Sequence, residues 1–145
     1  QNTQAREDLL RVGGDSAVQM QLDAVREGHC NLLPVSQLEP MLRVQVARDQ
    51  ALAAAVRQQV AARASPTQTV LLIAGSMHVD ARVGAPLHLP PGMTVKTLQL
   101  AVNAAQGATK TEALQREKAG FDARWTTAAP PAKDYCAQLK SPATK

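Results

Sequence analysis

A chain of 145 residues is long enough for one domain with a buried core, and its composition excludes several classes of protein. The net charge is +4, but the basic residues are scattered, and only 2% of the residues are aromatic. Nucleic-acid-binding surfaces combine a basic groove with aromatic side chains that stack on bases, so we expect no nucleic-acid partner. No apolar run approaches the length of a membrane span.

The hydrophobic core is expected to be thin. Phe121, Trp125 and Tyr135 are the only aromatic residues, and all of them lie late in the chain, so the preceding segments must pack on aliphatic side chains. We expect such a core to need a partner, either a second copy in a homodimer or another part of the same protein. The chain begins at Gln1 with neither an initiator Met nor a signal peptide, which predicts a mature product or a fragment of a longer protein.

The first predicted helix covers residues 16–27. Residues 1–14 are polar and end in Gly13-Gly14, which predicts a loop or a frayed helix end. Asp15 and Ser16 then offer an N-cap. The apolar residues that follow recur at helical spacing: Val18, Leu22 and Val25.

The strongest helical pattern runs over residues 37–63. Pro40 suits a first turn, and the alanine run at 53–55 has high helix propensity. The face expected to be packed is formed by Met41, Val44, Arg48, Ala51, Leu52, Ala55 and Val56.

Three segments are predicted to be strands. Residues 70–74 form a short apolar run between turn residues, which is typical of a central, parallel strand that is buried on both faces. Residues 94–102 alternate and are β-branched, which favours a half-buried or edge strand, and residues 121–127 favour a short edge strand. The predicted fold class is therefore α/β, with a partly parallel sheet flanked by long helices.

The C-terminal part carries few structural signals. Residues 103–117 are polar and rich in Ala, Gly and Thr, which predicts a mobile surface loop, and residues 128–145 contain several prolines, which predicts an extended tail. We expect an α/β unit over residues 1–106, followed over residues 107–145 by the polar loop, the edge strand and the tail.

The first candidate site is Gly75-Ser76-Met77-His78, directly after the predicted strand at 70–74. Ligands bind at the carboxyl ends of strands in α/β sheets. Glycine there lets the backbone turn and approach a ligand, and histidine ligates metals. A Gly-x-x-His sequence is also common in ordinary turns, and in that case His78 would point to bulk solvent.

The second candidate site lies on the long predicted helix. Gln45 and Arg48 are three residues apart and share a face, so both are candidate ligand-binding residues. Arg48 could meet a propionate or another carboxylate. Alternatively, Arg48 extends into solvent and Asp49 forms a surface ion pair.

The cysteines are too few and too far apart for a zinc finger. Cys30 and Cys136 can form a disulfide that joins the early helix to the tail, or they are two unrelated buried thiols; we expect the disulfide. His29 and Cys30 are adjacent and point in different directions on an extended chain, so a metal pair is not favoured. His88 is expected to be a surface residue.

No catalytic motif is complete in this sequence. Ser76 lies near His78, but a nucleophile and its base usually come from separate segments. The sequence has no Walker loop, no His-Glu-x-x-His and no Gly-x-Ser-x-Gly. We therefore name no catalytic residue and expect a binding protein rather than an enzyme.

Several stretches together resemble the ChaN family, the haem-binding uptake lipoproteins of the TraB/Tiki/erythromycin-esterase superfamily. The similar stretches are residues 45–53, 70–78 and 84–89, and more loosely 125–127 and 134–136, so that the resemblance covers roughly residues 15–139. It concerns only the C-terminal half of the family's domain, because the family's opening Gly-Glu-x-His strand has no counterpart here. Family haem ligation by tyrosine does not carry over, since Tyr135 lies in the tail.

The resemblance implies a haem- or iron-binding protein of iron uptake, exported and located in the periplasm or at the outer membrane. It implies haem as the cofactor and His78 as a metal ligand, with an N-terminal half of the same protein as a partner. The alternatives are a metal-dependent hydrolase of the Tiki/TraB type and a non-catalytic interaction fragment.

Overall fold

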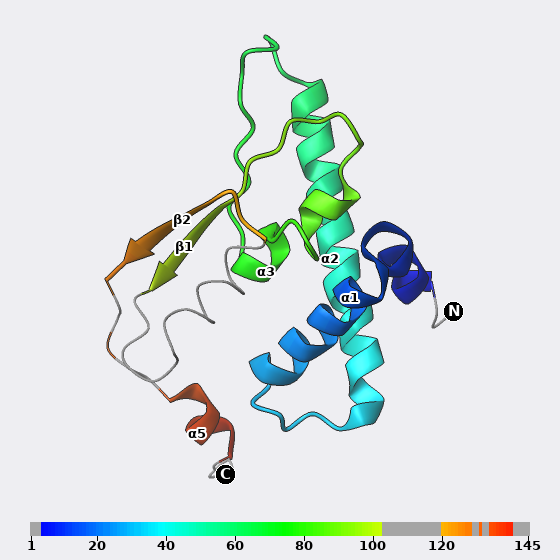
Figure 1. Cartoon of the computed structure of the whole chain (residues 1–145), viewed down its shortest axis with the longest axis vertical. Coiled ribbons are helices and arrows are strands. Elements are labelled where there is room, and N and C mark those ends of the chain that lie inside the picture. The colour runs from blue at the N-terminus through cyan, green and yellow to red at the C-terminus, as the bar shows by residue number, and fades with distance from the viewer. Residues whose placement is uncertain (1–3, 103–119, 129–130, 132–133, 141–145) are drawn as a thin grey trace.

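A long central helix organises the molecule. The computed structural model describes residues 4–102, 120–128, 131 and 134–140. Helix α2 (Val35–Ala61) runs through the centre, α1 (Gln4–Gly28) packs across it, and the two strands lie on the side away from α1 (Figure 1). Mixed α/β architecture with long helices and a parallel strand pair is confirmed. None of the helices in the described ranges is long and apolar enough to cross a membrane.

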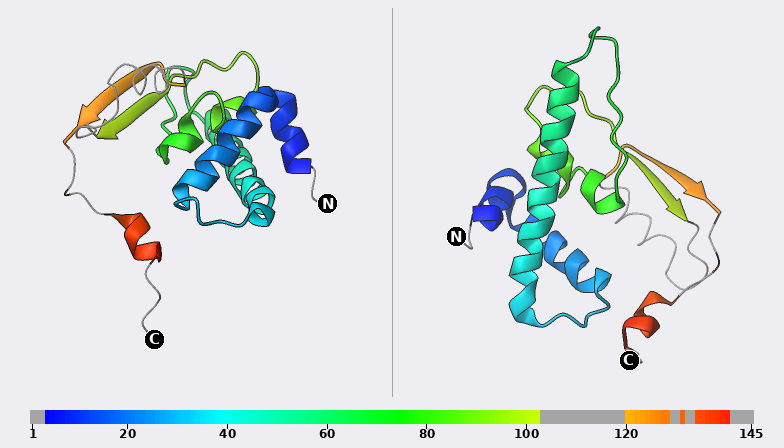
Figure 2. Two further views of the ribbon diagram at one scale, coloured as in Figure 1. Left: turned by 60° about the horizontal axis from the view of Figure 1, so that its bottom comes forward. Right: turned by 180° about the vertical axis from the view of Figure 1, so that it is seen from behind.

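Helix α1 begins earlier than the sequence predicted and bends at a pair of glycines (Figure 2). The segment expected to be a loop or frayed end is helical from Gln4, because Leu9 is fully buried and holds this first part against the core. Gly14 has φ 68°, a conformation that favours glycine, and produces the bend. Gly13 allows close packing, since a Cβ there would lie 2.5 Å from the Ala17 Cβ atom.

Helix α2 has nearly the predicted bounds, but its packed face differs from the prediction. Val44, expected to pack, has 41% of its surface exposed, and Arg48 is also exposed. The face that is buried consists of Leu38, Leu42, Val46, Asp49 and Ala53. Aliphatic residues occur on several sides of this helix, so their spacing did not identify a single stripe.

The core lies where α1 and α2 cross. Its buried cluster joins residues from both helices to one residue of the loop after α3 (Ser76–Val79): Leu9, Ala17, Val18, Leu42, Val46 and Val83. The short helix η1 (Ala85–His88) closes over the same crossing and contacts both α1 and α2. The core is wholly aliphatic, as the lack of aromatics in this part of the chain predicted.

Residues 70–74 form an extended segment, but they are neither a strand nor buried on both faces. Leu71 and Ile73 are 79% and 83% exposed, whereas Leu72 and Ala74 on the alternate side are half-buried. The prediction of a central strand is therefore wrong for the described residues. An apolar run can supply strand-forming side chains, but it does not determine whether another strand lies beside it. In the described part of the chain, no strand pairs with residues 70–74.

The sheet consists of β1 (Leu98–Val102) and β2 (Ala123–Thr127), paired in parallel from Leu98–Ala123 to Val102–Thr127. The predicted strand at 94–102 begins four residues later, at Leu98, and the predicted edge strand is confirmed over residues 123–127. Asp122 fixes the entry to both strands, because its carboxylate accepts hydrogen bonds from the Thr97 amide at 2.8 Å and from Lys96 at 2.9 Å. These bonds lower the pKa of Asp122 to about 2.

The tail contains a helix, α5 (Tyr135–Lys140), where the sequence predicted extended chain. Asp134 caps it by accepting a hydrogen bond from the Ala137 amide at 2.8 Å. The predicted disulfide between Cys30 and Cys136 is present, with Cα atoms 5.5 Å apart, and ties α5 to the loop between α1 and α2. The predicted mobile loop at 103–117 lies outside the described residues, and the division at residue 106 stays a prediction.

Candidate functional site

His78 lies on the short helix α3, which follows the extended segment at 70–74. Helix α3 begins after Gly75, whose carbonyl accepts a hydrogen bond from the His78 amide at 2.9 Å. The glycine that needs close approach is Gly84 rather than Gly75. A Cβ on Gly84 would lie 2.5 Å from the backbone carbon and oxygen of His78, whereas one on Gly75 would meet only the His78 ring, at 3.8 Å. Gly75 also has φ −60°, which any residue adopts.

The ring of His78 is held by a buried carboxylate on α2. His78 Nδ1 lies 2.6 Å from Asp49 Oδ1, and Asp49 is fully buried. This hydrogen bond fixes the ring orientation and uses one ring nitrogen, so Nε2 is the nitrogen left for a ligand. The expected alternative, in which Asp49 forms a surface ion pair, is wrong because Asp49 faces the core side of α2.

A glutamine on α1 completes the support of Asp49. Gln21 is 2% exposed, and its Nε2 donates to Asp49 Oδ2 at 3.1 Å and to the Val83 carbonyl at 3.2 Å. Both carboxylate oxygens of Asp49 therefore accept a hydrogen bond. The hydrogen bonds from Gln21 to Asp49 and from His78 to Asp49 connect α1, α2 and α3, so the orientation of the His78 ring depends on how these helices pack.

The charge of Asp49 is sensitive to its surroundings. Burial raises the pKa of Asp49 above the ordinary value, and the hydrogen bond from His78 acts in the opposite direction. A buried carboxylate is stabilised by donors on both oxygens, which His78 and Gln21 provide here.

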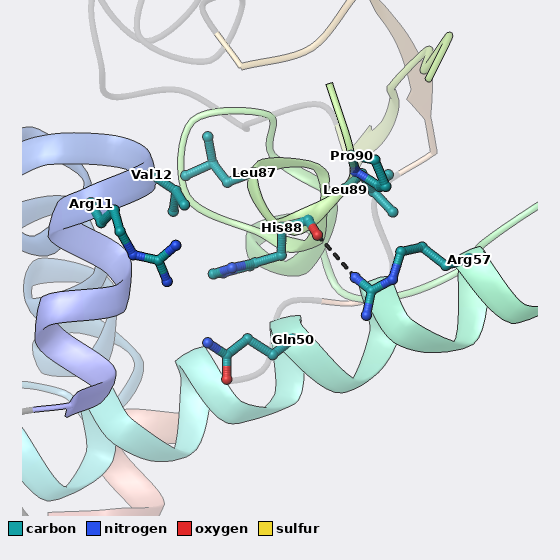
Figure 3. Close-up of a pocket in the computed structure, with 8 residues that line it drawn as sticks. All are labelled: Arg11, Val12, Gln50, Arg57, Leu87, His88, Leu89 and Pro90. Carbon is teal, nitrogen blue, oxygen red and sulfur yellow. Dashed lines mark hydrogen bonds between the residues drawn. The ribbon is translucent and has the colours of Figure 1, made fainter. Parts of the chain in front are cut away.

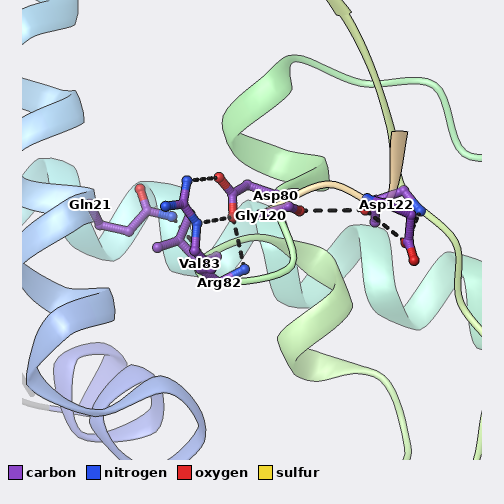
Figure 4. A network of polar contacts seen from close by, with 7 residues as sticks. Gln21, Asp80, Arg82, Val83, Gly120 and Asp122 are labelled. Atoms are coloured by element: carbon purple, nitrogen blue, oxygen red, sulfur yellow. Dashed lines mark hydrogen bonds and ion pairs between the residues drawn. The ribbon is translucent and has the colours of Figure 1, made fainter. Parts of the chain in front are cut away.

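The loop after His78 is fixed by a second polar network (Figure 4). Asp80 is 2% exposed and accepts hydrogen bonds from the Arg82 amide at 2.8 Å and the Arg82 guanidinium at 2.6 Å. The Ala81 amide donates to the Gly120 carbonyl at 2.9 Å, which joins this loop to the segment that enters β2. Only glycine fits at position 120 in this arrangement, because a Cβ there would collide with the Asp80 carboxylate.

A hollow opens beside His78. It has a volume of about 430 Å³ and is lined by Arg48, Ala51, Leu52, Ala74 and His78. This volume lies within the range of small-molecule and cofactor sites. The walls are mostly apolar, and the hollow brings together two predicted site residues, His78 and Arg48, that are far apart in the sequence.

The other predicted site residues take different positions. Gln45 is half-buried and does not line the hollow, so its ligand-binding role stays a prediction. Gly75 borders the His78 ring. His29 Nδ1 lies 2.7 Å from the Val25 carbonyl oxygen, and Cys30 is bonded to Cys136, so each already has a structural partner.

Sequence reasoning missed the residues that support His78. Asp49 was considered only for a surface pair, and Gln21 was not singled out. The available signal was a polar residue within an apolar stripe: Gln21 lies between Val18 and Val25 on α1, as Asp49 lies between Val46 and Ala53 on α2. Polar groups at such positions need buried partners.

Across the described residues, no group of three or more His, Cys, Asp or Glu side chains is placed to hold a metal ion. A haem, by contrast, brings its own iron, and a single protein side chain such as a histidine can hold that iron. One imidazole nitrogen, an apolar wall and a nearby arginine fit that requirement.

Comparison with known proteins identifies the family of this chain. Residues 1–89, more than half of the chain, match the family model described as "Haem-binding uptake, Tiki superfamily, ChaN". The match includes His78, Asp49, Gln21 and Arg48 and ends at Leu89, so the looser resemblance at 125–136 is not covered by it. Searches of the curated proteins and of the solved structures found no match. The chain belongs to the ChaN family of haem-binding uptake proteins in the Tiki superfamily.

Proposed function

We propose that this chain binds haem in the hollow beside α2, where His78 Nε2 would hold the iron. The observation that carries the proposal is the 2.6 Å hydrogen bond between His78 Nδ1 and the buried Asp49. A carboxylate at the second nitrogen fixes the tautomer and raises the basicity of a ligating histidine. The turn interpretation of Gly75-Ser76-Met77-His78 does not require a buried carboxylate at this point.

Arg48 is proposed to bind a haem propionate. Arg48 lines the hollow next to Ala51 and Leu52, and no ion pair links it to any acidic side chain of the described residues. A guanidinium is suited to a carboxylate because it presents donors in a planar fork. Ala51, Leu52 and Ala74 would contact the apolar porphyrin, and when bound, the haem would supply the iron and its redox chemistry.

The biological role that we propose is haem or iron uptake in an exported protein of the periplasm or outer membrane. The Cys30–Cys136 disulfide supports an oxidising compartment, because such bonds persist outside the cytosol. A further part of the protein, or a second copy, is proposed to cover the exposed side chains of Leu71 and Ile73.

A haem titration followed by the Soret band tests the proposal. The wild-type chain should bind haem saturably, and His78→Ala should weaken binding by at least about tenfold. Arg48→Gln should weaken it less, and His29→Ala serves as the matched control because His29 lies outside the hollow. Equal affinity of the wild type and His78→Ala would contradict the assignment of the ligand.

A further inference from the structure

A second pocket lies on another side of α2, between α1 and η1 (Figure 3). Its volume is about 490 Å³, and its polar lining comes from all three elements: Arg11, Gln50, Arg57 and His88. Gln50 is two residues from Arg48, and two residues rotate a helix by about 200°, so this pocket and the His78 hollow face different directions. It therefore forms a site of its own.

Positive charge exceeds negative charge around this pocket. Asp8 accepts hydrogen bonds from Arg11 at 2.9 Å and from Gln50 at 3.2 Å. Arg57 donates to the His88 carbonyl at 3.1 Å, and within the described part of the chain no carboxylate forms an ion pair with Arg57. Of the two guanidinium groups that line the pocket, only that of Arg11 is paired with a carboxylate of the described residues.

The ring of His88 contains an unsatisfied polar atom at the same place. His88 Nε2 is buried and has no hydrogen-bond partner among the described residues. Buried polar atoms are nearly always hydrogen-bonded, so an isolated one in a pocket wall indicates an absent partner. In Figure 3 the ring extends toward the guanidinium of Arg11, with Gln50 below it. Burial lowers the pKa of His88, which keeps the ring neutral and able to donate a single hydrogen bond.

We propose that this pocket binds a small organic anion through its carboxylate or phosphate group. The anionic group would lie between Arg11 and Arg57 and accept a hydrogen bond from His88 Nε2. Arginine is suited to both groups because its donors match their paired oxygens. The apolar part of the ligand would contact the remaining wall, which consists of Val12, Leu87, Leu89 and Pro90. This site is independent of haem binding at His78.

Titrations of the whole chain with benzoate, phenyl phosphate and neutral benzyl alcohol, followed by NMR chemical shifts, test this proposal. At least one anion should bind saturably and more tightly than the alcohol, and the two anions distinguish a carboxylate from a phosphate site. Arg57→Gln should weaken anion binding by about tenfold or more, as expected for loss of a charge-assisted hydrogen bond. Its haem affinity should be unchanged.

Arg26→Gln is the matched control, because it removes the same charge from an arginine that pairs with Asp23 outside the pocket. Circular dichroism checks that each variant is folded, and Arg11→Gln replaces Arg57→Gln if the latter unfolds. The proposal is overturned if neither anion binds more tightly than benzyl alcohol. It is also overturned if the folded arginine variant binds the anions as well as the wild type.

Discussion

At the scale of single residues, the contact between His78 and Asp49 decides what the site can do. An exposed histidine on a short helix would rotate freely, whereas this one has Nδ1 fixed by a carboxylate that is itself held by Gln21. The cost of burying Asp49, seen in its raised pKa, is offset by these two donors. The result is an imidazole with one nitrogen directed by the protein and the other left for a ligand.

Replacement of Asp49 by Asn tests this positioning role. The variant keeps the shape of the side chain but removes its charge, so we expect haem affinity to fall by about 10- to 100-fold, the usual effect of losing a group that orients a metal ligand. Absorption titration of haem measures the change.

Asp23→Asn is the control for this variant, because Asp23 is a half-exposed carboxylate paired with Arg26 on α1 and does not contact His78. It should bind haem as the wild type does. If Asp49→Asn also retained wild-type affinity, Asp49 would have only a structural role.

At the scale of elements, the close contact between the loop of Gly84 and helix α3 positions His78. Gly84→Ala would place a Cβ against the backbone of His78 and Met77, so helix and loop must move apart. We expect unfolding free energy to fall by about 1–3 kcal/mol, as for other overpacked sites. Haem affinity should fall with it. Denaturant unfolding and haem titration measure the two effects.

Gly75→Ala provides the contrast, since Gly75 has ordinary backbone angles and space for a methyl group. Its stability should stay within about 1 kcal/mol of the wild type. An equal loss in both variants would show that the contact between Gly84 and His78 is not what matters.

Local sequence patterns predicted where helices and strands lie better than they predicted which elements pack against one another. The long helix was predicted within two residues at each end, because propensity and periodicity act within a segment. The apolar run at 70–74 was read as a buried strand, but burial and pairing depend on residues far away in the chain. The cap on α5 by Asp134 was a local signal that the prolines of the tail obscured.

For the site, the sequence indicated His78 and Arg48 but not the residues that hold the His78 ring. Gly-x-x-His and a helix cation are visible as short patterns, and the structure places both in one hollow. Asp49 and Gln21 were not recognised as a pair, because their contact joins different helices and depends on the crossing of α1 and α2.

At the scale of the whole molecule, the Cys30–Cys136 disulfide joins the C-terminal helix α5 to the loop between α1 and α2. Tyr135 and Leu139 of α5 are 66% and 61% exposed, so α5 buries little apolar surface of its own. Cys30 and Cys136 are 106 residues apart, and closing a loop of this length restricts the unfolded chain strongly.

We expect reduction of this disulfide to lower the free energy of unfolding by up to about 5 kcal/mol in the loop-entropy model. Urea unfolding with and without a reductant measures the change. The double variant Cys30→Ser/Cys136→Ser should unfold like the reduced wild type and should not respond to the reductant. Two alkylatable thiols in the untreated protein would show that the bond is absent.

The identity of the iron ligand is the central claim, and it can be measured on the haem complex itself. The chain has only three histidines, His29, His78 and His88, so labelling all of them with ¹⁵N leaves few assignments. Pulsed EPR of the ferric complex should detect a directly bonded histidine ¹⁵N that disappears in His78→Ala and persists in His29→Ala and His88→Ala. A spectrum without this coupling, or one in which it survives in His78→Ala, would contradict the proposed site.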